Sequence, residues 1–380
     1  MIPIERTCCA ITHANDLEPL YRFESFPVFM GCTHDDPSTD VVMPMDWWIS
    51  RSSGLIQLKS LVPLEMLYMS AHGSGCIGKL WEQHHEAFAQ FIAHYHPKGV
   101  IEIGGGHGIL SQAYHQGVDA GVQWTIVEPN PTPATGVKAT YIKGFFDETF
   151  SFDGDYDAIV HSHVFEHMYK PDAFIQHLAK FSQEGKMHLF SVPNIAKMLE
   201  RKYTNGINFE HTLSLTEPYM EYLLAKHGFR IQAKQYFMED HSIFYATVRY
   251  ANIEPVSLGL SLYETNKKLY FEYVSYHLDL VETLNQKIQA SDSPVFLFGA
   301  HVFSQYLIAF GLDTTRLTGL LDNDSAKQGK RLYGTSLQVY SPQVLATIKE
   351  PAVILKAGVY NEEIKREILD NISASTIFLE

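Results

Sequence analysis

A glycine-rich run followed by an acidic residue carries the clearest chemical signal in the sequence. The run reads Glu102-Ile-Gly104-Gly-Gly106-His-Gly108. It follows an apolar segment at 100–103 and precedes a helical pattern at 109–114. Glycines at such a turn let backbone N–H groups approach a ligand at the positive end of the helix. Glu128 ends the next apolar segment, where its carboxylate can accept both hydroxyls of a ribose. These residues predict a site for a nucleoside-type cofactor.

The spacing of the glycines distinguishes between two kinds of cofactor. The E-x-G-x-G-x-G form is typical of the first motif of class I methyltransferases, whereas a dinucleotide fingerprint requires G-x-G-x-x-G. The residue three positions after Gly106 is Ile109, so the dinucleotide spacing is absent. We therefore predict S-adenosylmethionine as the cofactor and disfavour NAD. The residues expected to hold it are Glu102, Gly104, Gly106, Gly108 and Glu128.

Two further segments are expected to line the same site. Gly144-Phe-Phe146-Asp147 follows a predicted third strand, where the ring of Phe146 can cover an adenine. His161-Ser-His163 follows a predicted fourth strand, at the carboxyl edge where open α/β sheets bind ligands. We therefore expect Phe146 and His163 to contact the cofactor.

The elements that must position these residues alternate between short apolar runs and helical patterns. The expected strands are Val100–Ile103, Trp124–Val127, Tyr156–Val160 and Met187–Val192, with two closing strands at 231–237 and 243–249. The alternation predicts βαβ units and a mainly parallel sheet, to which the two closing strands add antiparallel at the edge. The predicted fold class is α/β, with a Rossmann-like core of the class I methyltransferase type.

Different patterns flank this core on both sides. The segment before it mixes turn formers with short apolar runs, which predicts a small, strand-rich domain. After Pro255 we expect a long amphipathic helix and then a smaller Rossmann-like α/β unit. The strands of that unit are expected at 295–298, 318–321 and 352–355. The resulting division is an N-terminal domain at 1–75, the cofactor-binding core at 76–250, and the connecting helix with a C-terminal domain at 251–380.

Composition excludes several classes of partner. Lys and Arg number 29 against 43 Asp and Glu, a formal net charge of -14. Binding to a nucleic-acid backbone needs clustered Lys and Arg, and the sequence has no basic run, so we expect no nucleic-acid partner. The sequence also lacks an apolar stretch long enough for a membrane span, and its start lacks the apolar region of a signal peptide. Four cysteines are too few for a disulfide framework in 380 residues. We expect a cytoplasmic protein that acts on a small molecule and does not associate with membranes.

Several short motifs spread along the chain agree with one family pattern. They are Tyr68-Met-Ser70 with His84, His163-Val-Phe-Glu-His167, Asn208-Phe-Glu210-His211, Asp322-Asn-Asp-Ser-Ala-Lys327-Gln328-Gly329, Gly334-Thr335 and Pro342. With these motifs the chain resembles, over nearly its whole length, the three-domain sugar C-methyltransferases. That family methylates a ring carbon next to the carbonyl of a nucleotide-linked keto-deoxysugar. The resemblance implies a small zinc-binding domain, a SAM-binding core and a C-terminal Rossmann-like domain, in that order.

The zinc site of that family is not retained in the sequence. Its ligands form two C-x-x-C pairs, the second directly before a G-L-V-Q-L run, which here reads Gly54-Leu-Ile-Gln-Leu58. The four ligand positions are occupied by Cys9, Thr12, Ser50 and Ser53. A closed tetrahedral zinc site needs Cys or His ligands. We therefore expect no zinc there, with Cys9 packed as a small apolar residue, and we assign no metal ligand elsewhere in the chain.

The resemblance also implies roles for individual residues. Methylation of carbon requires removal of a proton next to a carbonyl, by a base whose pKa lies near the working pH, and histidine suits this task. The last histidine of the family's Y-H-E-H signature carries over to His211 as the base. Glu210 would orient that base or contact the sugar. His167 and Tyr68 would bind the substrate oxygen or line the methyl-transfer cleft.

One departure in that signature leaves other functions open. Asn208 replaces its first tyrosine. Methylation of oxygen or nitrogen on another small molecule is one alternative. A protein that keeps the SAM-binding fold without turnover is another, because it would retain Glu102 and Glu128 but would not need His211. Isotope transfer from labelled S-adenosylmethionine would distinguish an enzyme from such a binding protein.

Overall fold

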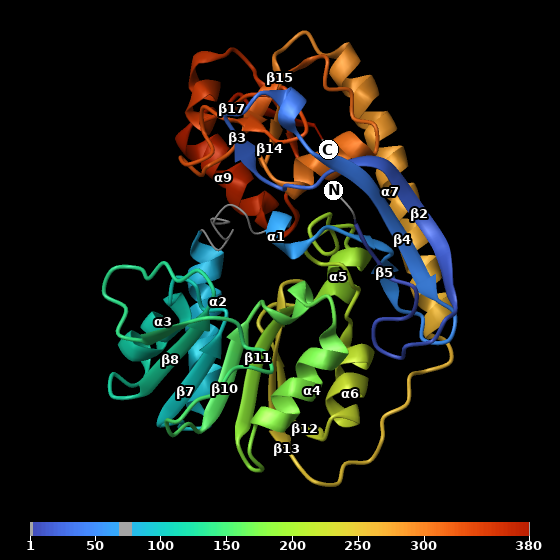
Figure 1. Cartoon of the computed structure of the whole chain (residues 1–380). Helices are drawn as coiled ribbons and strands as arrows, with labels where there is room; N and C mark the ends of the chain where they lie inside the picture. The colour runs from blue at the N-terminus through green and yellow to red at the C-terminus, as the bar shows by residue number, and fades with distance from the viewer. Residues whose placement is uncertain (1–2, 68–77, 380) are drawn as a thin grey trace.

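The computed structural model describes residues 3–67 and 78–379, and its largest element is a seven-stranded sheet (Figure 1). The strand order is β12-β13-β11-β10-β7-β8-β9. The strands are β7 (Gly99–Ile103), β8 (Gln123–Glu128), β9 (Thr140–Lys143), β10 (Ala158–Ser162), β11 (Met187–Pro193), β12 (Phe229–Tyr236) and β13 (Ser242–Arg249). Strands β7 to β11 pair in parallel with one another. The predicted α/β fold with a mostly parallel sheet is confirmed.

Helices cover both faces of this sheet, which explains why its central strands read as continuous apolar runs. Side chains of α2 (Lys79–Ala93) and α3 (Ile109–Gly117) pack on one face, against Val100 and Val160. Side chains of α4 (Pro171–Phe181) and α6 (Glu217–Lys226) pack on the other face, against Ile101 and Ile159. Neighbouring residues of one strand thus enter two different cores.

The structure corrects the prediction for the two closing strands. Only β13 is antiparallel to the sheet, and it lies between β11 and β12 instead of at the edge. The edge strand is β12, which pairs with β13 alone. Burial gives the physical reason, because residues 242–248 are all buried whereas β12 is partly exposed along its length. A strand without polar faces needs neighbours on both sides, and a partly polar strand tolerates the edge.

A second sheet, of five parallel strands, lies near the C-terminus in the order β17-β15-β14-β18-β19. Its elements are β14 (Val295–Phe298), α8 (Val302–Ala309), β15 (Leu317–Leu321), β17 (Val339–Tyr340), β18 (Ala352–Leu355), α9 (Asn361–Asn371) and β19 (Ile377–Leu379). The three strands expected from the sequence are present. The two edge strands β17 and β19 were not predicted, because runs of two or three residues give no periodic signal.

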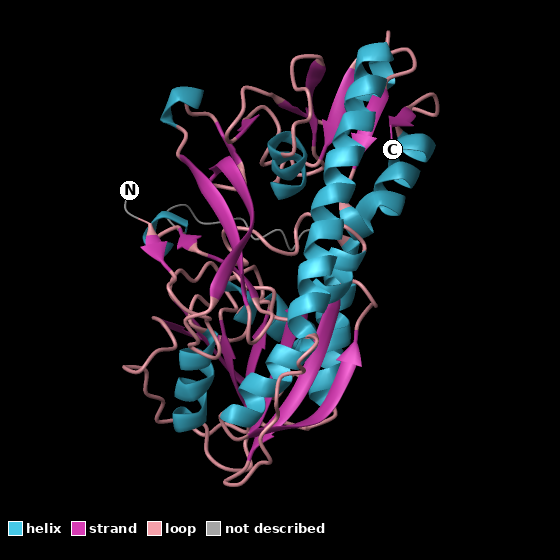
Figure 2. Cartoon of the chain, turned by 90° about the vertical axis from the view of Figure 1, so that its right-hand side faces the viewer, coloured by secondary structure: helices cyan, strands magenta, loops and turns pink. Residues whose placement is uncertain are grey.

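An antiparallel N-terminal sheet and one long helix connect the two larger sheets (Figures 1 and 2). The sheet contains β2 (Leu17–Pro27), β4 (Val42–Ser50) and β5 (Ile56–Leu58), and α7 (Leu262–Ala290) runs beside it. Trp47 of β4, Tyr270 of α7 and Tyr306 of α8 belong to one buried cluster. The smaller elements are β1 (Ile4–Glu5), β3 (Cys32–Thr33), β6 (Ser60–Leu61), α1 (Leu64–Leu67), α5 (Ile195–Glu200) and β16 (Arg331–Leu332).

The N-terminal sheet and helix α8 both contact the segment between α5 and α6, which contains Glu210 and His211. The backbone N–H of Leu58 donates to the carbonyl of Thr212 at 2.9 Å, so the N-terminal sheet holds this segment from one side. The hydroxyl of Tyr306 donates to the carbonyl of Ile207 at 2.6 Å and holds it from the C-terminal unit. Hydrogen bonds from two other parts of the chain therefore hold this segment in place.

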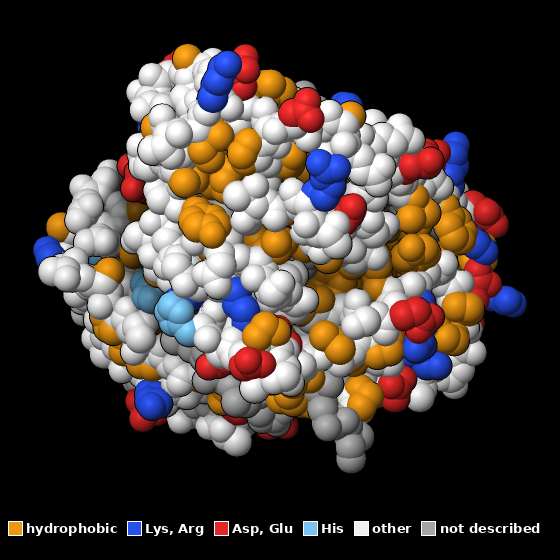
Figure 3. All heavy atoms as spheres, turned by 90° about the horizontal axis from the view of Figure 1, so that it is seen from above, with side chains coloured by type: hydrophobic (Ala, Val, Ile, Leu, Met, Phe, Trp, Pro, Cys, Tyr) orange, Lys and Arg blue, Asp and Glu red, His pale blue; other side chains and the backbone are white. Residues whose placement is uncertain are grey.

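The surface seen from above mixes charges of both signs (Figure 3). Lys and Arg side chains alternate with Asp and Glu on this face, and no continuous basic area is visible there. Among the helices of the described residues, α7 included, none is long and apolar enough to cross a membrane.

Candidate active site

The predicted cofactor turn has a backbone that only glycine adopts without strain. Gly104 and Gly108 have φ angles of 76° and 71°, in the left-handed region. Gly108 is the residue that precedes α3, so the turn opens directly into the helix. A helix that begins at a glycine turn presents free N–H groups to a ligand, as the sequence predicted.

Glu102 lies beneath this turn and supports it. A Cβ atom on Gly105 would lie 2.5 Å from the Glu102 carboxylate, so the turn can rest on that side chain only because residue 105 is glycine. The indole N–H of Trp124 donates to Oε2 of Glu102 at 2.7 Å. Burial raises the pKa of the Glu102 carboxyl to about 7, against the opposing effect of the Trp124 hydrogen bond. Glu102 therefore exchanges a proton near neutral pH.

Glu128 and Tyr141 border the same turn. Oε1 of Glu128 accepts a hydrogen bond from the backbone N–H of Asn130, and its Oε2 is 3.7 Å from the position of a Cβ on Gly106. The hydroxyl of Tyr141 is buried without a hydrogen-bond partner among the described residues, beside Gly108. A carboxylate, an unpaired hydroxyl and an open glycine backbone fit a ribose and its neighbouring polar groups.

The two phenylalanines after β9 have different environments. The ring of Phe146, which was expected to cover the adenine, packs against Phe150, Phe174 and Phe181, with ring centroids 5.3, 6.2 and 5.2 Å away. The ring of Phe145 is 69% exposed. Of the two rings, Phe145 is therefore the accessible one, and Phe146 contributes to the core beneath α4.

The residues expected to do chemistry gather around a buried carboxylate that the sequence analysis did not single out. Glu166 and His167 belong to a short helix after β10. One nitrogen each of His167 and His211 and one oxygen of Glu166 lie within 4.8 Å of one another. The rings of His167 and His211 meet edge to face, with centroids 4.7 Å apart, and Nδ1 of His167 lies 3.8 Å from Oε2 of Glu210. The structure thus brings His167, Glu210 and His211 together.

Hydrogen bonds fix the backbone that carries Glu210 and His211. The side-chain oxygen of Asn208 accepts from the N–H groups of both residues, at 2.8 and 3.0 Å. Nδ1 of His211 lies 3.3 Å from the carbonyl oxygen of Gly206. A carbonyl only accepts, so Nδ1 carries the proton and Nε2 holds the lone pair. His211 therefore has the tautomer of a base that acts through Nε2.

Burial and charge set the protonation of these groups. Burial alone would raise the pKa of the Glu166 carboxyl, but His163, His167 and His211 favour the carboxylate and hold that pKa at about 2. Burial lowers the pKa of His211 to about 4; His167 lowers it further, and Glu166 opposes the effect. Near pH 7, Glu166 is anionic and His211 is neutral.

Two predicted residues stand apart from this arrangement. Tyr68 lies outside the described residues. The ring of His163 contacts Glu166 through Nδ1, at 2.9 Å, and Ser242 through Nε2, at 2.8 Å, so its contact with the cofactor stays a prediction. Glu166 was missed although it lies within the quoted motif His163-Val-Phe-Glu-His167, because a lone Glu beside two histidines reads as a solvent-facing charge.

Three of the four positions that correspond to zinc ligands contact one another. Sγ of Cys9 contacts Oγ of Ser53 at 3.3 Å, and the backbone N–H of Ser53 donates to Oγ of Ser50 at 3.3 Å. Thr12 uses its hydroxyl on the backbone N–H of Ala14 instead. Cys9 is fully buried in the hydrophobic cluster beneath α6, so the prediction that it packs as an apolar residue is confirmed.

A family model covers the segment that contains the cofactor turn. Residues 80–234 match a family model described as a methyltransferase domain. A search of curated proteins finds no match to the sequence. Among solved structures, the plantazolicin methyltransferase BpumL, in complex with a monoazolic desmethylPZN analog and SAH, is 12% identical with a TM-score of 0.37, over 44% of this chain and 84% of that chain.

Two further solved structures are similar at the same level. An O-methyltransferase family protein from Burkholderia thailandensis is 12% identical with a TM-score of 0.38, over 46% of this chain and 57% of that chain. The mitomycin 7-O-methyltransferase MmcR is 16% identical with a TM-score of 0.36, over 43% of this chain and 54% of that chain.

The matched segment contains the features that define the cofactor site. The glycine turn, Glu102 and Glu128 all lie between residues 80 and 234, on consecutive strands of a mostly parallel sheet. The segment 80–234 is therefore a methyltransferase domain built on a Rossmann-like, mostly parallel sheet, with S-adenosylmethionine as its cofactor.

Proposed function

We propose that the chain methylates a carbon next to the carbonyl of a nucleotide-linked keto-deoxysugar, with His211 as the general base. The observation that carries this proposal is the neutral His211, held beside His167 and the anionic Glu166 near the carboxyl end of β10. Ligands of open α/β sheets bind at that edge. A neutral imidazole with its lone pair on Nε2 can accept a proton from carbon, although its lowered pKa of about 4 makes it a weaker base than the sequence predicted.

The cofactor site uses residues of the glycine turn. Bound S-adenosylmethionine supplies an electrophilic methyl group on a sulfonium sulfur. Glu128 would accept hydrogen bonds from the ribose hydroxyls, and the backbone at Gly104 and Gly106 would approach the remainder of the cofactor. Glu102 would support the turn from below. We include Phe145, whose ring is exposed, as a candidate cover for the adenine.

The chain's own groups account for the proton transfer. The bond between the acceptor carbon and its hydrogen breaks, the proton moves to Nε2 of His211, and the electron pair enters the enolate formed with the neighbouring carbonyl. The resulting imidazolium is stabilised by Glu166 and Glu210, the two carboxylates that favour the charged form of His211. The enolate carbon would then be the nucleophile for the methyl group that S-adenosylmethionine supplies, with the electron pair of the broken carbon–sulfur bond left on sulfur. His167, whose ring meets that of His211, would contact the acceptor oxygen.

The three-unit architecture supports an acceptor larger than a simple sugar. We propose boundaries near residues 75 and 250, with an N-terminal unit, a methyltransferase core and a C-terminal unit. The core segment with Glu210 and His211 is held by Leu58 from the N-terminal unit and by Tyr306 from the C-terminal unit. An acceptor that spans this junction would contact all three units, and a sugar with a nucleotide attached would be large enough to do so.

Transfer of label to a panel of ketosugar nucleotides tests the proposal. The protein is incubated with methyl-labelled S-adenosylmethionine and each acceptor, and the product mass and the position of the label are determined. A methyl group on the carbon next to the carbonyl is the expected result. A label on oxygen or nitrogen overturns carbon methylation while it leaves the methyltransferase assignment in place. Absence of transfer to any small molecule, with intact cofactor binding, favours a binding protein without turnover.

A further inference from the structure

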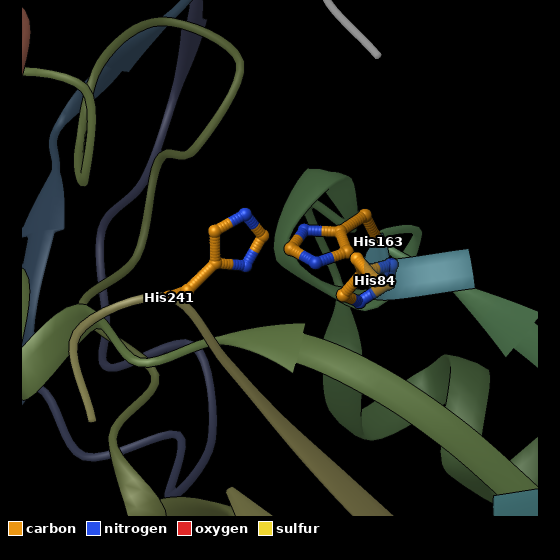
Figure 4. A group of neighbouring side chains, drawn as sticks. All are labelled: His84, His163 and His241. Atoms are coloured by element: carbon orange, nitrogen blue, oxygen red, sulfur yellow. The ribbon is translucent and has the colours of Figure 1, made fainter. Parts of the chain in front are cut away.

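Three histidine side chains from three separate elements meet beside the loop after β10. His84 lies on α2, His163 directly follows β10, and His241 lies in the turn between β12 and β13. One nitrogen of each ring lies within 4.8 Å of a nitrogen of the other two. Figure 4 shows the ring of His241 facing the ring of His163, and the ring of His84 lies next to the latter, with centroids 5.1 Å apart. Nitrogens that lie this close together can share one small ion after small shifts of their rings.

Each ring is also held by an oxygen atom. Nδ1 of His163 lies 2.9 Å from Oε1 of Glu166, and Nε2 of His84 lies 2.9 Å from Oγ of Ser191. Metal-bound histidines characteristically use one ring nitrogen for the ion and the other for a carboxylate or another oxygen, which fixes the ring orientation. The pairs His163 with Glu166 and His84 with Ser191 have this arrangement.

The hydroxyl of Ser242 completes the set of outer contacts. Its Oγ lies 2.6 Å from Nδ1 of His241 and 2.8 Å from Nε2 of His163. One hydroxyl has a single proton to donate and serves two rings here. His163 can therefore release this contact to an ion while Ser242 keeps His241 in place.

One buried ring nitrogen in the cluster lacks a hydrogen bond among the described residues. It is Nδ1 of His84, on a side chain that is fully buried. A buried polar atom without a partner is costly, because it has lost its contact with water and gained nothing in return. The neighbouring carboxylate of Glu166 is also buried, at 2% exposure, and contacts His163 through Oε1. A cation between the three rings would give Nδ1 of His84 a partner and would place positive charge next to Glu166.

We propose that His84, His163 and His241 bind one divalent transition-metal ion, with Glu166 as the outer carboxylate. Neutral imidazoles suit Zn²⁺ and the neighbouring transition metals, whereas Mg²⁺ and Ca²⁺ prefer oxygen ligands. Three protein ligands are the number found in zinc sites that leave a position for water or substrate. Glu166 also approaches His167 and His211, so the ion lies next to the groups of the proposed acceptor site. Its existence does not depend on the identity of the acceptor.

A purely structural cluster is the competing explanation. The ring of Trp81 packs on all three histidines, with centroids 5.2, 4.9 and 5.0 Å from those of His84, His163 and His241. Histidines packed around a tryptophan would need no ion. They would then bind no metal in stoichiometric amounts, which separates the two explanations by a direct measurement.

Metal content and metal binding test the proposal. The full chain is purified, dialysed against a chelator and titrated with Zn²⁺ by calorimetry, and the bound metal is counted by elemental analysis. We expect about one Zn²⁺ per chain. Co²⁺ in its place should give visible absorption bands of a low-coordinate, nitrogen-bound ion. Absence of stoichiometric binding of either metal to the wild-type chain overturns the proposal, and this result does not depend on any variant.

Matched variants locate the ion. His84→Gln and His241→Ala should each lose Zn²⁺ binding, and Glu166→Gln should weaken it by about 10- to 100-fold, the usual effect of losing an outer partner. His211→Ala and Cys9→Ala should keep it, because they belong to the neighbouring cluster and to the degenerate N-terminal motif. Circular dichroism checks the fold of each variant. Retention of Zn²⁺ in the folded His241→Ala variant, or its loss in His211→Ala, overturns the assignment.

Discussion

The side-chain oxygen of Asn208 accepts a hydrogen bond from the backbone N–H of His211 at 3.0 Å. Asn208 is buried, and it stands at the position of the first tyrosine in the sugar C-methyltransferase signature that the sequence resembles. The position therefore holds the turn that presents His211, and it offers no phenol to a substrate. A residue that acts through another in this way is a positioning residue.

Replacement of Asn208 tests this role. Asn208→Ala removes the acceptor for two backbone N–H groups, and we expect it to destabilise the fold by about 1–3 kcal/mol and to lower kcat with little change in the affinity for S-adenosylmethionine. Asn208→Asp keeps the oxygen and should restore most of kcat. Urea unfolding and steady-state kinetics provide the measurements. If both variants lose kcat equally, the side chain acts by another route.

Two buried histidines make the stability sensitive to acid. The hydroxyl of Thr247 donates its proton to the backbone carbonyl of His188. The same hydroxyl oxygen therefore accepts a hydrogen bond from Nδ1 of His188, which must carry the proton of this ring. Its Nε2 accepts from Nε2 of His161, 3.0 Å away. Burial lowers the pKa of His161 to about 3 and also lowers the pKa of His188. The bond between the two rings additionally requires His188 to stay neutral. A second proton on His188 would occupy Nε2, the acceptor, and would break this bond.

The sign of the pH dependence follows from these lowered pKa values. Below pH 6.5 the unfolded chain binds protons on both histidines and the folded chain does not, so stability is full above pH 6.5 and falls as the pH drops toward about 3. Each histidine contributes roughly 1 kcal/mol per pH unit. Urea unfolding of chelator-treated protein at pH 7 and pH 5 measures the slope. The double variant His161→Phe, His188→Phe should flatten it, whereas exposed His94→Ala should not.

The neighbouring phenylalanines after β9 form a matched pair. Phe145→Ala should weaken binding of S-adenosylmethionine by about tenfold or less, because it removes one stacking surface of about 0.5–1.5 kcal/mol, and should leave stability unchanged. Phe146→Ala should destabilise the fold by about 2–3 kcal/mol, less than the loss of a fully buried ring, because it removes packing against α4. Titration calorimetry and thermal unfolding separate the two effects. If Phe146→Ala weakens cofactor binding and Phe145→Ala does not, Phe146 is the residue that covers the adenine.

The same pair shows what the sequence could predict and what it could not. Strands β7, β8 and β11 were placed to within about a residue, because strands buried on both faces read as apolar runs. Adjacent residues with identical side chains, such as Phe145 and Phe146, give no such signal, because only packing decides which ring is buried.

Contacts between residues far apart in the sequence could not be predicted either. The position of β13 between β11 and β12 depends on pairing partners, which local periodicity does not report. His84, His163 and His241 come from separate parts of the chain, so no motif spacing joins them. The cofactor turn could be predicted from the sequence because all of its residues lie within one short run, from Gly104 to Gly108.

Cofactor binding should depend on the charge of Glu128. S-adenosylmethionine or its demethylated product should raise the temperature of unfolding, and NAD should not. Glu128→Gln exchanges charge-assisted hydrogen bonds to the ribose for neutral ones, which lowers affinity by roughly tenfold or more. Exposed Glu148→Gln is the control in the same domain and should bind as wild type. Unchanged affinity of the Glu128→Gln variant would remove Glu128 from the cofactor site.

Removal of His211 should lower turnover without weakening the binding of S-adenosylmethionine. His211→Ala should keep the affinity for S-adenosylmethionine and lower turnover by roughly a hundredfold or more, the usual scale for losing a positioned base. Because burial lowers the pKa of His211 to about 4, the base is deprotonated over the physiological range, and the acid limb of kcat/KM in wild type should lie well below pH 6.5.

Proton exchange distinguishes the base from a residue that only binds the acceptor. With the demethylated cofactor product in place of S-adenosylmethionine, solvent deuterium should enter the acceptor carbon in wild type and more slowly in His211→Ala. Exchange at the wild-type rate in that variant would assign the base elsewhere, with His167 as the next candidate because its ring meets that of His211. Methylation in wild type without loss of any carbon-bound proton would show that the acceptor is oxygen or nitrogen. His211 would then bind the acceptor without acting on its carbon.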